Sequence, residues 1–127
     1  MVIVDTSVWI PALKSKDAPE KAEIRRLVLA REAAIVGIVL VEILRGAKDR
    51  GDFDELLDQL QAAVIVDDDE ESWLLASQIL FDLRRSGQSI PMPDAVIAAH
   101  AILGDHSLYT SDQHFQRIPS VKLHEVS

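Results

Sequence analysis

Cysteine is absent from the 127-residue chain, which excludes disulfide bonds, zinc sites built from thiolates and cysteine nucleophiles. Long hydrophobic runs are also missing, since the longest, Ala33–Val41, is far shorter than the ~20 residues that a membrane-spanning helix needs. The N-terminus lacks a basic stretch followed by an apolar segment, because Asp5 interrupts Met1–Ile10, so no signal peptide is expected. Together these absences predict a cytoplasmic protein.

Positive charge is scarce in this sequence. Thirteen Lys and Arg residues stand against 21 Asp and Glu residues, and the formal net charge of −8 argues against a protein that grips nucleic acid by bulk charge. A nuclease is not excluded, because a crowded carboxylate site contributes negative charge that a bound divalent metal ion neutralises. An acidic surface equally suits a basic protein partner.

The length, together with an apolar content of 48%, predicts one domain over residues 1–127 with a substantial core. Short apolar segments are predicted as strands at Val2–Val4, Ala34–Val36, Ala63–Val66, Ser107–Thr110 and Val121–His124. Helices are predicted between them at Val8–Leu13, Pro19–Arg31, Ile38–Arg45, Phe53–Leu60, Glu70–Arg85, Asp94–Leu103 and Asp112–Arg117. This alternation predicts an α/β fold with a central parallel sheet and helices on both faces.

Two of these helices carry specific expectations about burial. Within Glu70–Arg85, an apolar stripe of Trp73, Ala76, Leu80 and Leu83 is expected to face the core. The helix Ile38–Arg45 is apolar nearly all round and is therefore expected to be buried.

Four acidic residues stand where this fold gathers ligands. Asp5 directly follows the first strand, Asp112 follows the fourth with only Ser111 between, Glu42 lies about a turn past the second, and Asp94 opens a helix. Because ligands bind at the carboxyl ends of strands in open parallel sheets, these side chains can converge at one edge. Each has a structural alternative: Asp5 and Asp112 as helix N-caps, Asp94 as a complement to a helix dipole, and Glu42 in an ion pair with Arg45.

The buried helix around Glu42 favours the functional interpretation. A buried carboxylate without a partner is costly, so it usually pairs, binds metal or takes up a proton. Carboxylate oxygens are the hard ligands that Mg²⁺ and Mn²⁺ prefer, and such ions activate water for phosphodiester hydrolysis. The sequence has no P-loop, no GxGxxG fingerprint and no HExxH motif.

Four segments resemble, in order, the motifs of PIN-domain ribonucleases, and in length and order those of VapC-type toxins. They are Val2–Ser7, Glu42–Ala47, Asp94–Ala101 and Thr110–Phe115. The resemblance implies a PIN-like domain that cleaves RNA with Mg²⁺ or Mn²⁺, forms a homodimer and is inhibited by a cognate antitoxin. It implies metal ligation by Asp5, Glu42, Asp94 and Asp112, and a catalytic site completed by the hydroxyl of Thr6. One departure is His114, which stands where many relatives carry a further acid.

Other functions stay open at this point. A PIN fold acting only as a binding or dimerisation module is one alternative. A phospho-accepting receiver domain is another, although it needs adjacent acids and a lysine, and here Asp5 stands alone and Lys122 lies within the last apolar segment. Arg45, Lys48 and Arg50, together with Arg84 and Arg85 at the end of another helix, are candidates for guiding RNA phosphates toward the acids, with solvated helix ends as the alternative. The acidic run Asp67–Glu71 is interpreted as the solvated start of a helix.

Overall fold

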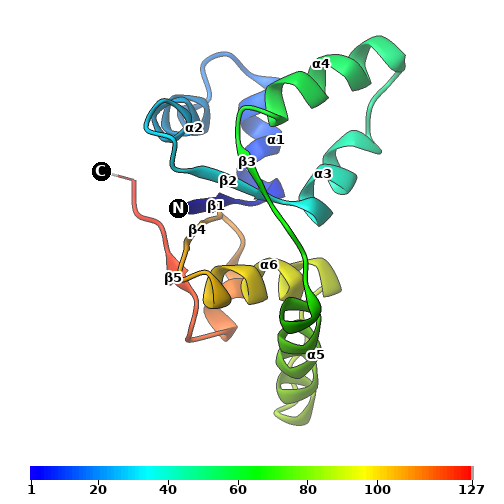
Figure 1. Ribbon diagram of the computed structural model, residues 1–127, viewed down its shortest axis with the longest axis vertical. Coiled ribbons are helices and arrows are strands. Elements are labelled where there is room, and N and C mark those ends of the chain that lie inside the picture. The colour runs from blue at the N-terminus through cyan, green and yellow to red at the C-terminus, as the bar shows by residue number, and fades with distance from the viewer. Residues whose placement is uncertain (127) are drawn as a thin grey trace.

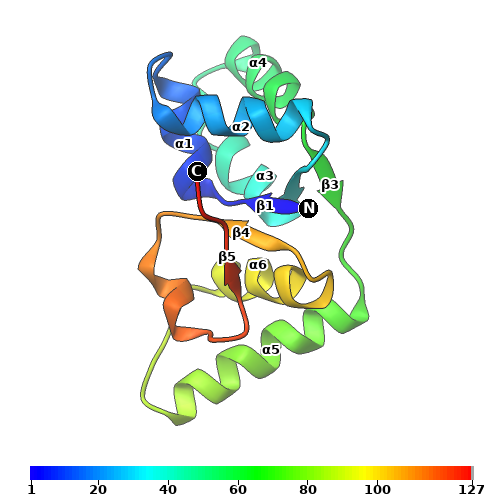
Figure 2. The ribbon, with the colours of Figure 1, turned by 90° about the vertical axis from the view of Figure 1, so that its left-hand side faces the viewer.

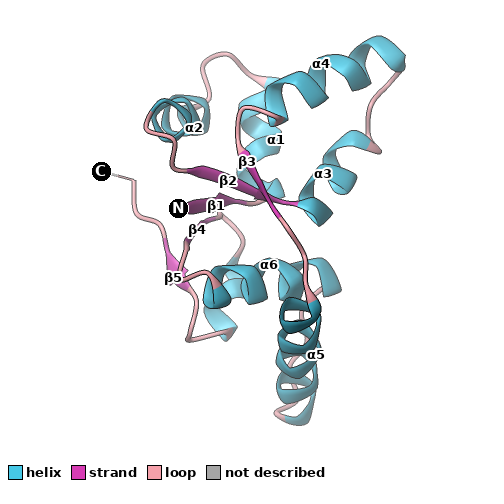
Figure 3. Ribbon diagram, in the orientation of Figure 1, coloured by secondary structure: helices cyan, strands magenta, loops and turns pink. Residues whose placement is uncertain are grey.

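A five-stranded, all-parallel sheet forms the centre of the computed structural model, which describes residues 1–126 (Figures 1 and 3). The predicted parallel sheet is therefore confirmed. Its strands lie in the order β3-β2-β1-β4-β5. Their bounds are β1 (Val2–Val4), β2 (Ala33–Val36), β3 (Val64–Val66), β4 (Ser107–Tyr109) and β5 (Lys122–Leu123).

Helices cover both faces of this sheet, as the sequence predicts. Figures 1 and 2 show one layer above the sheet that contains α1 (Thr6–Lys14), α2 (Pro19–Leu29), α3 (Gly37–Leu44) and α4 (Arg50–Leu60). The opposite layer contains α5 (Glu70–Arg85), α6 (Met92–Leu103) and the short 3₁₀ helix η1 (Gln113–Arg117). Across residues 1–126, every helix is too short or too polar to cross a membrane.

The strand order reverses direction between β1 and β4. The chain first proceeds outward from β1 to β2 and β3, and then returns through α5 and α6 to place β4 on the other side of β1. Val2 pairs with Ala33 of β2 on one side and with Ser107 of β4 on the other. The carboxyl ends of β1 and β4 therefore border a topological switch point, which is where open α/β sheets bind ligands.

Burial on both faces explains why the central strands are so apolar. Every residue of β1 and β2 is buried, because helices pack on each side of them. The β-branched side chains that dominate these strands suit the pleated surface. Both strands consist of apolar residues, so no polar side chain is buried within them. This rigid centre fixes the strand ends next to which the acidic residues lie.

The burial predicted for two helices is wrong in detail. Trp73 is 51% exposed, and α5 instead buries Ser72, Ala76, Ile79 and Leu83, a stripe displaced toward the neighbouring face. In α3, Val39 and Ile43 are buried but Val41 is 59% exposed. Both helices are apolar on more than one face, so periodicity alone does not identify the face that packs on the sheet.

The predicted end of the second helix is also wrong by two residues. The helix stops at Leu29, and Arg31 adopts a left-handed conformation with φ of 59°. The peptide N–H groups of Arg31 and Glu32 then donate to the carbonyls of Val28 and Leu27. This pair of hydrogen bonds is a Schellman motif, which normally contains glycine at the left-handed position.

A buried ion-pair cluster ties the C-terminal segment to α2. Glu23, which is 6% exposed, accepts hydrogen bonds from the Arg26 guanidinium and pairs with Nε2 of His124 at 2.7 Å. The hydrogen bonds from Arg26 are the main reason that the pKa of Glu23 is lowered from 4.5 to about 2. Its carboxylate form therefore stabilises the folded chain.

We expect Glu23→Gln to destabilise the protein at neutral pH, by on the order of 2 kcal/mol. Because the folded pKa of about 2 lies below the unfolded value of 4.5, this contribution is complete above pH 4.5 and is lost as the pH falls toward 2. Urea unfolding at pH 7 and pH 3 measures the difference. Glu55→Gln, at an exposed position on α4, is the matched control, and an equal loss at both pH values would contradict the assignment.

Candidate active site

Asp5 is held in a fixed orientation at the carboxyl end of β1. It is 3% exposed and caps α1, with Oδ1 accepting hydrogen bonds from the Ser7 hydroxyl at 2.6 Å and the Ser7 peptide N–H at 3.1 Å. Its Oδ2 accepts a hydrogen bond from the Thr110 hydroxyl at 2.8 Å. One of the hydroxyl groups that orient Asp5 thus lies on the helix that follows β1, and the other follows β4. These are the two strands at the switch point.

Asp94 and Asp112 meet around the imidazole of His114. Asp94 lies in the first turn of α6, and Asp112 caps η1 by accepting a hydrogen bond from the His114 peptide N–H. Nδ1 of His114 lies 2.8 Å from Oδ2 of Asp94 and 3.0 Å from Oδ1 of Asp112. Residues from α6 and from the loop after β4 are therefore in direct contact.

Glu42 reaches the same place from α3. Its Oε1 accepts a hydrogen bond from the Thr6 hydroxyl at 3.0 Å, so the first residue of α1 orients it. Within the described chain, no ion pair joins Glu42 to Arg45. A cavity of about 300 Å³ is lined by all five residues singled out from the sequence, namely Asp5, Thr6, Glu42, Asp94 and Asp112.

Asp5 and Asp112 cap helices, as their structural interpretation predicts, and they also meet the other acids at the cavity. Both side chains are N-caps, as their residue type favours, and both line the cavity. A carboxylate accepts hydrogen bonds through one oxygen and still presents lone pairs elsewhere. Capping therefore fixes the orientation of these carboxylates without removing them from the cavity.

The crowding of carboxylates changes their acidity. Burial raises the pKa of Asp5, the hydrogen bonds from Ser7 and Thr110 oppose that rise, and the Asp94 carboxylate adds to it. Burial also raises the pKa of Asp94, with His114 opposing the rise and Asp112 and Glu42 adding to it. The fold thus forces negative charges together where water screens them poorly.

Two residues of the site escaped the sequence analysis. Ser7 and Thr110 donate to Asp5, and the Ser7 hydroxyl also accepts from the peptide N–H of Ser111 at 3.0 Å. Ser111 thus contributes its backbone N–H to the site. The available signal was the position of these hydroxyl residues just past the two strands that flank the switch point, with Thr110 directly after β4 and Ser7 in the first turn of α1.

Other charged groups have structural partners away from the cavity. Asp69 caps α5 in a capping box with Ser72, and Asp68 pairs with the buried His100 of α6 at 2.6 Å. Lys122 pairs with Asp105 at 2.7 Å and does not line the acid cavity, which disfavours a receiver-type phosphorylation site. The acidic run therefore organises α5 and α6, as its interpretation as a helix start implies.

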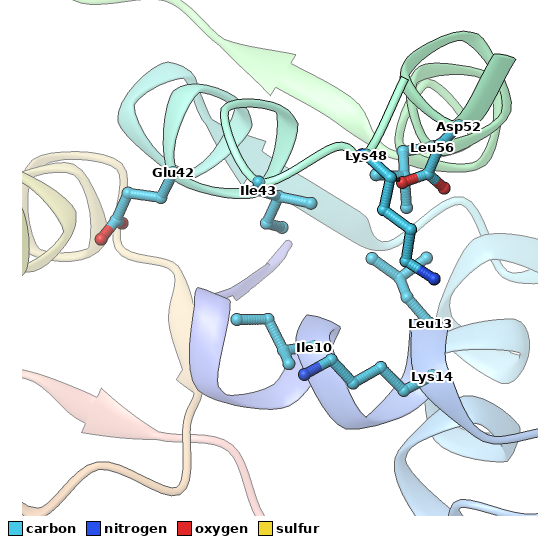
Figure 4. A pocket seen from close by; sticks show the side chains of 9 residues that line it. Ile10, Leu13, Lys14, Glu42, Ile43, Lys48, Asp52 and Leu56 are labelled. Carbon is cyan, nitrogen blue, oxygen red and sulfur yellow. Dashed lines mark hydrogen bonds between the residues drawn. The ribbon is translucent and has the colours of Figure 1, made fainter. Parts of the chain in front are cut away.

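A second hollow, a groove, lies next to the acid cavity and shares the lining residue Glu42 with it. It has a volume of about 570 Å³, and Ile10, Leu13, Ile43 and Leu56 form much of its lining. Figure 4 shows the side chains of Lys14, from α1, and Lys48, from the loop after α3, extending into this hollow. Glu42 lines both spaces, so the groove with its two lysines and the cavity with its acids adjoin at this residue.

Comparison with known proteins agrees with this arrangement. The PIN domain family matches residues 2–121. The chain is 31% identical over 125 residues to Ribonuclease VapC18 of Mycobacterium tuberculosis H37Rv, covering 93% of this chain and 87% of that relative. Its fold resembles VapBC2 from Rickettsia felis bound to a DNA fragment from their promoter, with TM-score 0.85, 25% identity and full coverage of both chains. A toxin–antitoxin complex from Klebsiella pneumoniae shares the fold, with TM-score 0.75, 22% identity and coverage of 99% and 100%.

We expect Asp94→Asn to stabilise the protein in the presence of EDTA at pH 7. The raised pKa of Asp94 means that ionising it costs the folded state free energy, a penalty that grows as the pH rises above 3.8 and is complete above the folded pKa. The asparagine oxygen keeps an acceptor for His114 and removes the charge. A gain of 1 kcal/mol raises Tm by about 4 °C in a domain of this size.

The matched control is Asp58→Asn, which removes a carboxylate from an exposed position of α4. Differential scanning calorimetry of both variants and the wild type gives the comparison. A lower Tm for metal-free Asp94→Asn, with Asp58→Asn unchanged, would show that the carboxylates do not repel one another as described.

Proposed function

The chain belongs to the PIN domain family, and on that premise we propose that it is a metal-dependent endoribonuclease, the toxin of a toxin–antitoxin pair. The observation that carries this proposal is the single cavity lined by Asp5, Glu42, Asp94 and Asp112 at the carboxyl ends of β1 and β4. Four carboxylates in one cavity, two of them with raised pKa values, leave negative charge that the surrounding side chains do not neutralise.

The residues of this cavity fit a divalent cation. Carboxylate oxygens are the donors that Mg²⁺ and Mn²⁺ prefer, and we assign metal ligation to Asp5, Glu42, Asp94 and Asp112. A bound divalent ion lowers the pKa of a water molecule and stabilises charge on a phosphodiester. The surrounding hydroxyl groups keep the carboxylates oriented before an ion arrives, because Ser7 and Thr110 fix Asp5 and Thr6 fixes Glu42.

The central test is RNA cleavage by the purified protein with and without Mn²⁺. We expect Asp94→Asn to lower the rate at least 100-fold, the scale of losing one group that stabilises transition-state charge. Asp58→Asn should cleave at the wild-type rate, and circular dichroism should show both variants folded.

The same experiment decides between an enzyme and an inactive module. A binding or dimerisation module predicts neither metal-dependent cleavage nor metal-dependent stabilisation. Wild-type protein that is folded and dimeric, and yet inert toward RNA with Mn²⁺ and with Mg²⁺, would replace the enzyme proposal with that alternative.

We propose that the RNA backbone enters along the groove shown in Figure 4. The overall charge of −8 repels phosphates, so a local source of positive charge is needed next to the acids. Lys14 and Lys48 supply it beside the acidic Asp52, which lines the same groove, whereas Arg50 is paired with Asp54 at 3.2 Å. Of the basic residues considered from the sequence, Lys48 therefore has the strongest support.

Lys14→Gln combined with Lys48→Gln should weaken RNA binding and reduce its salt dependence. Each lost phosphate contact lowers the slope of log K against log salt by about 0.7 for single strands, so the pair should lower it by about 1.4. Fluorescence anisotropy at several KCl concentrations, in the Asp94→Asn background so that RNA survives, measures this slope. Arg25→Gln, at an exposed position on α2 outside the groove, is the control, and an unchanged slope for the double variant would remove the groove from the RNA path.

Two protein partners complete the proposal. Relatives of this fold were solved as a VapBC2 complex and as a toxin–antitoxin complex, and we propose a cognate antitoxin for this chain as well. A neighbouring reading frame that encodes a small protein with a basic tail would support it. The homodimer stays a prediction, favoured by the exposed apolar side chains of Trp73, Leu74 and Phe81 on one face of α5.

A further inference from the structure

His114 occupies a position between two of the proposed metal ligands. It belongs to η1, its side chain is 37% exposed, and it contacts Asp94 and Asp112, two residues that line the cavity. Its Nδ1 contacts Oδ2 of Asp94 at 2.8 Å and Oδ1 of Asp112 at 3.0 Å. One ligand atom from each of these three residues lies within 4.8 Å of the other two.

We propose that His114 is itself a metal ligand through Nδ1, and that it makes the site prefer a transition-metal ion, with Mn²⁺ as the probe, over Mg²⁺. This inference rests on the proposed metal-dependent function and deepens it by assigning a ligand and a metal class. It gives a function to His114, which stands where many PIN-domain relatives carry a further acidic residue. Asp5 and Glu42 line the cavity next to this group of three, where they offer further oxygen donors.

The spacing of the three side chains supports direct ligation. Small divalent ions with octahedral geometry bind their ligands at about 2.1 Å, which places neighbouring ligand atoms about 3 Å apart. The two contacts of Nδ1, at 2.8 Å and 3.0 Å, match that separation. An ion that takes the place of these hydrogen bonds therefore requires little movement of the three side chains.

The chemistry of imidazole supports the choice of metal. Mg²⁺ is a hard ion that prefers oxygen ligands and gives up its water reluctantly, whereas first-row transition metals accept imidazole nitrogen readily. A site made only of carboxylates has no such means of discrimination. Replacing one oxygen donor with nitrogen shifts the preference away from Mg²⁺.

His114→Asp restores an all-oxygen donor set and is the informative variant. His106→Gln is the matched control, since His106 lies before β4, at the end of the strand opposite the acids, with Nδ1 against the N-terminal amine. Because the His114 side chain is partly exposed and aspartate is smaller than histidine, we expect the aspartate to fit. Circular dichroism checks the folding of both variants.

The experiment measures Mn²⁺ bound to the RNA-free protein by electron paramagnetic resonance. Electron spin-echo envelope modulation then reports whether a ligand nitrogen couples to the bound ion. We expect nitrogen coupling in the wild type and in His106→Gln, and its loss in His114→Asp. The amount of Mg²⁺ that displaces half of the bound Mn²⁺ should fall at least about tenfold in His114→Asp, the usual scale for altering one residue of a metal site.

The outcomes separate this inference from the proposed function. Bound Mn²⁺ without nitrogen coupling in the wild type would overturn the ligand assignment and leave metal-dependent cleavage standing. Nitrogen coupling that persists in His114→Asp would assign the ligand to another residue and overturn the proposal too. A wild-type protein that neither binds Mn²⁺ nor cleaves RNA would remove the proposed function itself, and this inference with it.

Discussion

Mutual repulsion among Asp5, Glu42, Asp94 and Asp112 is the constraint around which this site is built. The fold places the four carboxylates along one cavity of about 300 Å³, and burial raises the pKa values of Asp5 and Asp94. Hydrophobic burial in the sheet opposes that cost, since β1 and β2 are buried along their whole length. The stability of the strands thus holds in place an arrangement that these charges alone would disperse.

Topology accounts for which residues meet. Asp5 and Thr110 are 105 positions apart, yet they share a hydrogen bond because β1 and β4 are neighbours across the switch point. The Asp68–His100 pair adds a tie between the loop after β3 and α6, the helix that carries Asp94. Local propensity forms each element, and the return of the chain through α5 and α6 brings the carboxylates together.

The sequence predicted the parts of the structure that depend on local patterns. Alternating apolar strands and helices, together with acids after the strands, were sufficient for the sheet and for the candidate acids. It could not predict that α5 buries Ile79 and exposes Trp73, because both faces of that helix carry apolar residues. The hydrogen bonds of Ser7 and Thr110 to Asp5, and the groove beside Glu42, depend on strand neighbours that no local pattern specifies.

The distribution of charge reconciles an acidic protein with the RNA substrate that we propose for it. Net charge governs long-range attraction, whereas a phosphate that has entered a groove responds to the groups within a Debye length, about 8 Å at physiological salt. Along the groove those groups are Lys14 and Lys48 beside Asp52, whereas in the acid cavity past Glu42 they are carboxylates. The lysines of the groove therefore attract a phosphate, whereas the carboxylates of the acid cavity repel it until cations neutralise them. RNA and a divalent ion must then strengthen each other's binding, since each reduces the repulsion that the other meets.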